Sequence, residues 1–235
     1  MSFKEAILRL CCDIGKAVHQ DAINDITKCH ILKNPSRDNH DDEYILRVLS
    51  FTSFYVAKQT YGYSETKIRY EVQLGHEEPL DYLPMNSSVY PINGSDEWMI
   101  YIGCKYDDWE QIFYEICHES VHLLNPAEHE DLPNVQRLDE GVAVKFAENM
   151  YKKYITPYTT KPPKFTPVRL ARLSQYTKSF NITNKISDEK LKEVRSIFGS
   201  FWSIPDKEKF MSIVGNYITD KEADYLLSDF DYNRP

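Results

Sequence analysis

Two histidines and a glutamate within five residues carry the clearest chemical signal in this chain. His118 and His122 are four residues apart, and Glu119 directly follows the first histidine. On a helix this spacing places the two imidazoles within about 40° of each other, so both can bind one ion. Zinc accepts neutral imidazole ligands, and an adjacent carboxylate can take a proton from a zinc-bound water. The segment therefore predicts a zinc site with Glu119 as its general base.

A hydrolytic zinc site also needs a third protein ligand and an open fourth position. Glu140 is the strongest candidate, because it opens a second predicted helix that can pack antiparallel against the first. We expect Gly141 to let these two helix backbones approach closely. Glu128 and His129 are rivals, but the Asn125-Pro126 pair lacks the glycine turn that would bring them back to the site.

Each of these candidates also has a simpler explanation. Asp139 and Glu140 could merely complement the positive amino-terminal end of their helix. Cys104 and Cys117 could supply thiolates, yet both are more typical of core positions, and Cys117 points about 100° away from His118 on the helix. Glu140 therefore remains the favoured third ligand.

Hydrophobic periodicity predicts the elements that position the site. Residues 67–74 and 97–103 have the composition of strands, with a weaker strand at 88–92. From 107 to 125 the apolar residues follow a helical period, with Asp107 as the expected N-cap and Glu110 as its capping-box partner. A further helix is expected at 139–154.

The flanking regions have a helical pattern. Helices are expected at 3–20 and 42–60, and three or four more after 155, with breaks at 162–167, 181–187 and Pro205. The sequence thus predicts an α+β fold. Residues 1–135 would form an amino-terminal lobe with helices, a small sheet and the histidine helix. Residues 136–235 would form a helical lobe carrying the third ligand.

Composition excludes several classes of protein. The net charge of -8 argues against a nucleic-acid or anionic-membrane partner, since phosphates require clustered Lys and Arg. The amino terminus carries charges where a signal peptide would be apolar, and we expect no membrane span. Five cysteines without a paired spacing suit a reducing compartment. We therefore expect a cytoplasmic protein, with delivery by a specialised secretion system as the alternative.

The segments "HESVH" and "LDEGVA" resemble the gluzincin branch of the zincin metallopeptidases, over residues 97–155. The resemblance implies a zincin-like fold, in which a small twisted sheet lies beside the active-site helix. It also implies zinc ligands at His118, His122 and Glu140, and a general base and acid at Glu119. The strand at 97–103 would be the edge along which extended substrate lies.

One position departs from that family's pattern. Some members have an acid one helical turn after the third ligand, where it orients a ligand histidine, but this chain has Val144 there. Asp139 could take over that orienting role.

These observations predict a zinc metallopeptidase that hydrolyses an intracellular protein or peptide, with the oxyanion stabilised by a donor from the second lobe. Tyr151, Tyr154 and Tyr158 are the candidate donors. Two alternatives stay open, namely a catalytically silent zincin that acts as a binding module and a zinc amidase that does not cleave peptides. Retention of Glu119 favours an enzyme, because a purely structural metal site needs no base.

Overall fold

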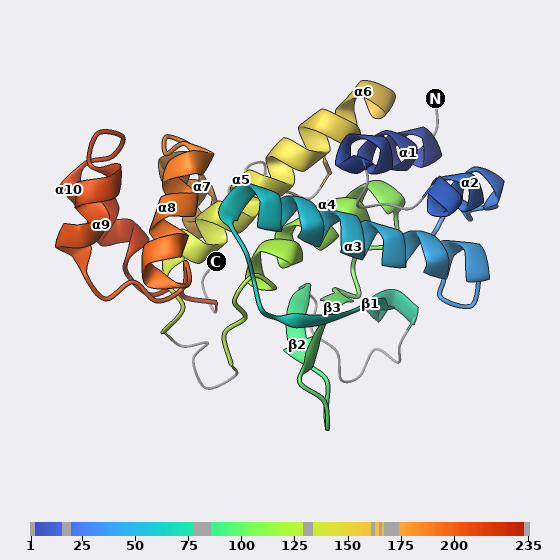
Figure 1. The fold of residues 1–235 in the computed structure, drawn as a ribbon, viewed down its shortest axis with the longest axis horizontal. Coiled ribbons are helices and arrows are strands. Elements are labelled where there is room, and N and C mark those ends of the chain that lie inside the picture. Colours follow the sequence, from blue (N-terminus) through green and yellow to red (C-terminus); the bar gives the residue numbers. More distant parts are fainter. Residues whose placement is uncertain are drawn as a thin grey trace.

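The computed structural model describes residues 3–15, 20–77, 86–128, 134–160, 163–164, 166 and 174–232. In this part of the chain, one small sheet lies at one side of a mostly helical molecule, below α3 and α4 in Figure 1. The α+β class expected from the sequence is confirmed. The elements are, in order, α1 (Phe3–Ile14), α2 (Gln20–Lys28), α3 (His40–Tyr61), β1 (Lys67–Leu74), β2 (Ser88–Pro91), β3 (Glu97–Ile102), α4 (Trp109–His122), α5 (Arg137–Tyr154), α6 (Thr156–Thr159), α7 (Ser174–Thr183), α8 (Asp188–Phe198), α9 (Lys207–Val214) and α10 (Asp220–Leu226).

The three strands lie close to the ranges predicted from the sequence, but the strand expected at the edge of the sheet is not an edge strand. β3 is the central strand, parallel to β1 and antiparallel to β2. Leu74 pairs with Ile102 on one side, and Ser88 pairs with Tyr101 on the other. The prediction that residues 97–103 form a sheet edge is therefore wrong. Period-2 alternation indicates that a segment is a strand. Which strands lie beside it in the sheet depends on contacts with distant parts of the chain.

α4 begins one residue later than predicted. Asp108 caps it, and its carboxylate accepts a hydrogen bond from the backbone N–H of Gln111 at 3.0 Å. Asp107 instead accepts one from the side chain of Asn34. Glu110 forms no capping box with Asp107, and its carboxylate accepts from a tyrosine hydroxyl of α5. With two successive aspartates, the sequence alone could not decide which one caps the helix.

α5 packs against α4, as expected, but Gly141 serves a different neighbour. A Cβ at position 141 would lie 2.9 Å from the backbone oxygen of Ser179 and would also clash with the hydroxyl of Thr183. Both of those residues belong to α7. Gly141 therefore permits the close approach of α5 to α7 rather than to α4, and the prediction of a close approach to α4 is wrong.

The flanking helices follow the predicted pattern only in part. The helix expected at 3–20 ends at Ile14, and α2, which was not predicted, begins at Gln20. α3 spans the helix expected at 42–60, with Asn39 as its N-cap. Breaks occur between α7 and α8 and at Pro205, as expected. Much of the break expected at 162–167 lies outside the described residues.

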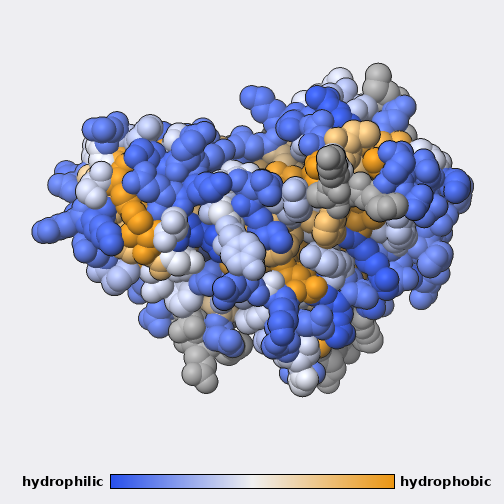
Figure 2. Space-filling model, viewed as in Figure 1, coloured by the Kyte–Doolittle hydropathy of each residue, from blue (hydrophilic) through white to orange (hydrophobic). Residues whose placement is uncertain are grey.

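Buried apolar side chains form one connected core that reaches from α1 to α10. α3 and α4 supply much of its centre, including Leu49 and Ile112, which are fully buried. Hydrophilic residues cover most of the face shown in Figure 2. The division into lobes at residue 135 remains a prediction. Among the described helices, none is both long enough and apolar enough to cross a membrane.

Candidate metal centre

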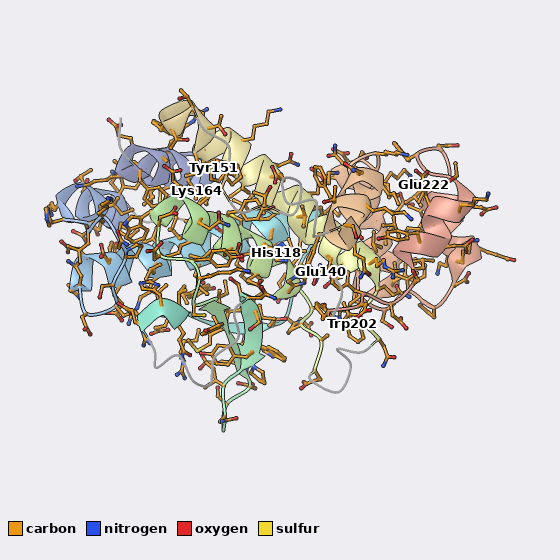
Figure 3. All side chains as sticks on the ribbon, turned by 180° about the vertical axis from the view of Figure 1, so that it is seen from behind. His118, Glu140, Tyr151, Lys164, Trp202 and Glu222 are labelled. Atoms are coloured by element: carbon orange, nitrogen blue, oxygen red, sulfur yellow. The ribbon has the colours of Figure 1, made fainter. Side chains whose placement is uncertain are left out.

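The crossing of α4 and α5 brings His118, His122 and Glu140 together (Figure 3). The Nε2 atoms of the two histidines are 3.1 Å apart. Oε2 of Glu140 lies 3.2 Å from Nε2 of His118 and 3.8 Å from Nε2 of His122. Two imidazole nitrogens and one carboxylate oxygen thus form a compact triangle, here termed the metal triangle.

This triangle has the size that one small metal ion requires. Donor atoms about 2.0 to 2.1 Å from a tetrahedral ion lie roughly 3.3 to 3.5 Å from one another. The side chain of Glu140 is only 4% exposed, and Oε2 receives no well-directed hydrogen bond from the described residues. A buried carboxylate oxygen is unfavourable unless a metal ion or a protonated histidine such as His118 completes it. The group could therefore hold a metal ion.

Asp139 contacts one of the two histidines of this group. Its Oδ2 lies 2.7 Å from Nδ1 of His122. When Nδ1 carries the proton and donates it to Asp139, the lone pair of Nε2 points to the centre of the triangle. The structure thus gives Asp139 the orienting position expected from the sequence, while Val144 is buried in the core.

The same carboxylates control the charge of the histidines when no ion is bound. Burial lowers the pKa of His122, but Asp139 and Glu140 outweigh it and raise the pKa to about 10. Burial raises the pKa of Glu140, but the histidines outweigh it, so the net shift is downward. The site therefore concentrates negative charge around two imidazoles, which favours a cation over an apolar ligand.

Glu119 is 4% exposed and lies next to His118 on α4. Burial raises the pKa of Glu119 to about 7, although His122 and His118 oppose this shift. A carboxylate with a pKa near neutrality can both accept and release a proton at physiological pH. Its environment therefore suits the general base and acid predicted from the sequence.

The tyrosines expected to stabilise an oxyanion lie elsewhere. The hydroxyl of Tyr151 donates to Glu110 at 3.1 Å, and that of Tyr154 donates to Asp13 at 3.0 Å. Glu110 precedes His118 by eight residues on the same helix, which corresponds to about 12 Å of rise. Figure 3 likewise shows Tyr151 apart from His118. The structure does not bring these two hydroxyls to the triangle of His118, His122 and Glu140. Tyr158 lies on α6 and packs against the core.

Two other tyrosines do approach the triangle. The hydroxyl of Tyr232 donates to Oε1 of Glu140 at 3.0 Å. The ring of Tyr176, on α7, lies 6.4 Å from the ring of His118. Neither position was singled out in the sequence, because no spacing links them to the histidines and the chain has 17 tyrosines.

Of the rival ligands that the structure describes, neither Cys117 nor Glu128 is part of this group. Cys117 is fully buried against the hydroxyl of Ser53, and burial raises the pKa of its thiol to about 12, so it is not a thiolate. Glu128 is exposed. His129 lies outside the described residues.

Comparisons with protein-family models, with curated proteins and with solved structures found no match to this chain. The case for a metal centre therefore rests on the side chains themselves. Their arrangement establishes a buried His–His–Glu group of the right size and charge to hold a metal ion.

Proposed function

We propose that this chain is a zinc-dependent peptidase of the zincin type. The observation that carries the proposal is the triangle of His118, His122 and Glu140, with Glu119 beside it on α4. Two histidines and one glutamate form the ligand set of several catalytic zinc sites, and three protein ligands leave a fourth position for water or substrate. A purely structural zinc site usually has four protein ligands and needs no neighbouring base.

The chemistry follows from the positions of these groups. Zinc bound here would supply Lewis acidity, polarising a carbonyl and making water a better nucleophile at neutral pH. Glu119 would accept the proton of the attacking water and deliver it to the leaving amine. Asp139 would hold the imidazole of His122 through both proton transfers. Tyr151 and Tyr154 have no part in this proposal, because their hydroxyls are engaged elsewhere.

We propose a protein or peptide as the substrate, bound by strand addition. β3 is the central strand, so it offers no free edge to a substrate. An extended peptide would instead pair with β2, which in the described structure is an edge strand paired with β3 alone. β2 also contacts α4, the helix that carries the two histidines. Main-chain hydrogen bonds from such an edge give affinity, and alternate side chains give selectivity.

The first experiment measures zinc by elemental analysis in the purified protein and in His118→Ala, Glu140→Ala and His129→Ala. We expect about one zinc per chain in the wild type and in His129→Ala, and loss of zinc in the other two. Zinc retained by Glu140→Ala but lost from His129→Ala would contradict the ligand assignment.

Glu119→Gln then separates catalysis from metal binding. We expect this variant to keep its zinc and to lose peptide hydrolysis by about 100-fold or more, because only the proton acceptor is removed. Activity would be followed by mass spectrometry of a diverse peptide mixture. Equal cleavage by the wild type and Glu119→Gln would contradict the role of Glu119. A zinc-loaded wild type that cleaves nothing would contradict the peptidase proposal and favour a binding module.

A further inference from the structure

The carboxyl-terminal segment 228–232 passes over the start of α5, beside the metal triangle. Asp229 forms an isolated β-bridge with Gln136. The N–H of Phe230 donates to the carbonyl of Val135 at 2.7 Å, and the N–H of Arg137 donates to the carbonyl of Ser228 at 3.0 Å. This segment, here termed the C-terminal strap, is thus attached by its backbone to the residues directly before Glu140.

A second set of contacts attaches the strap to α7. The ring of Phe230 lies 4.6 Å from the ring of Tyr176 and 4.8 Å from the ring of Tyr232. The side-chain nitrogen of Gln175 donates to the carbonyl of Asp231 at 3.3 Å. Because α5 and α7 both contact the strap, Tyr232 is held over the first turn of α5.

The strap contacts the metal triangle through the hydrogen bond between Tyr232 and Glu140. Tyr232 donates to Oε1, while Oε2 faces Nε2 of His118 and of His122. A carboxylate that accepts a hydrogen bond on one oxygen cannot rotate freely, so its other oxygen stays directed at the histidines. The bond also satisfies an acceptor on a side chain that is only 4% exposed.

We propose that Tyr232 is a positioning residue for Glu140, and that the C-terminal strap is therefore an integral part of the metal centre. The inference rests on the zinc site proposed above and extends it to a residue 92 positions away from the third ligand. Tyr232 would orient Glu140 as Asp139 would orient His122. Two of the three proposed ligands would then each have an orienting partner.

The test compares the zinc affinity of the wild-type chain and Tyr232→Phe by competition with a chelator of known affinity. We expect about a tenfold loss, at the lower end of the range for removing an orienting partner of a ligand, because the phenol donor is neutral. Tyr232 is 42% exposed, so removal of its hydroxyl opens no cavity in the core. The matched control is Tyr217→Phe, which removes a hydroxyl from a tyrosine that is 39% exposed.

Thermal unfolding of the metal-free proteins identifies a merely structural role. A merely structural role predicts a lower Tm for metal-free Tyr232→Phe with unchanged zinc affinity, because a buried acceptor of Glu140 loses its donor. A positioning role predicts, in addition to any loss of Tm, weaker zinc binding at a temperature at which metal-free Tyr232→Phe is fully folded. Unchanged zinc affinity would overturn the proposal, and so would tighter binding, which would mean that the hydroxyl competes with the ion for Glu140. Wild type that binds no zinc would instead overturn the proposed function, so the two failures are distinguishable.

Discussion

At the scale of single residues, Asp139 contacts one ring nitrogen of His122 and leaves the other for the proposed metal ion. Its carboxylate lies 2.7 Å from Nδ1, and its side chain is 9% exposed. A charged acceptor at this position stabilises the Nδ1–H tautomer and increases the basicity of Nε2. We therefore propose that Asp139 is as much a part of the site as the proposed ligands, although it is not a member of the triangle.

Asp139→Ala should weaken zinc binding by about 10-fold to 100-fold, because His122 loses the partner that fixes its ring and tautomer. Asp139→Asn keeps an acceptor oxygen without the charge, so its affinity should fall between those of wild type and Asp139→Ala. The measurement is chelator competition, with Asp38→Ala as the control at an exposed loop position. Wild-type affinity in Asp139→Ala would show that the contact is incidental.

The sequence predicted the part of the site that depends on local spacing. The two histidines are brought together by helical geometry alone, and Glu140 and Asp139 follow because they begin the adjacent helix. Tyr232 could not be predicted, because its contact depends on the path of the last residues over α5. Tyr151 was a poor candidate for a related reason: its position on α5 directs it toward Glu110, at the opposite end of α4 from His122.

At the scale of the elements, the packing of α5 between its neighbours determines where Glu140 lies. α5 contacts α4 on one side and α7 on another, and Gly141 follows the proposed ligand directly. The Cβ that Gly141 lacks would meet the backbone of Ser179, and backbone cannot move aside as a side-chain end can. The distance between α5 and α7 therefore depends on this one glycine.

Gly141→Ala should destabilise the protein. Overpacking costs about 1 to 3 kcal/mol, and the better helix propensity of Ala offsets up to about 1 kcal/mol of this. Zinc affinity should fall as well, since α5 must shift next to Glu140. Urea unfolding of the metal-free protein measures the first effect, with Asn149→Ala as the control at an exposed position of the same helix. A variant as stable as Asn149→Ala would show that α7 moves away without cost.

Strands were predictable as segments but not as a sheet. Alternation at 67–74, the composition of 97–103 and a weaker signal at 88–92 placed all three strands to within a residue or so. The order β1-β3-β2 depends on which strand pairs with which, and a parallel pair such as β1 and β3 leaves no local sequence signal. The same limit applies to Gly141, whose sequence context indicated a close helix contact but led to the wrong partner, α4 instead of α7.

At the scale of the whole molecule, Arg195 connects the carboxyl-terminal helices to the ends of α3 and α4. It lies on α8 and is 7% exposed. Its Nη1 donates to the carbonyls of Gly62 and Tyr63 at 3.1 and 2.7 Å, and its Nη2 donates to that of Leu124 at 2.8 Å. Carbonyls at helix ends have no partner within the helix. The guanidinium satisfies the carbonyl of Leu124 in a buried hydrogen bond and those of Gly62 and Tyr63 in partly buried ones.

Arg195→Leu should destabilise the metal-free protein by about 3 kcal/mol, because each buried carbonyl left without a donor costs about 1 to 3 kcal/mol and some will recover water. Arg195→Lys keeps the charge but lacks the planar fork that reaches both helix ends, so it should fall between Arg195→Leu and wild type. Urea unfolding gives the free energies of unfolding, and Ser196→Ala, at the next and exposed position of α8, is the control.

Since Leu124 lies two residues after His122, the less stable variants of Arg195 should also bind zinc more weakly at equal temperature. Stability of Arg195→Leu within about 0.5 kcal/mol of the control would mean that water replaces the guanidinium, and that α8 does not fix the end of the histidine helix.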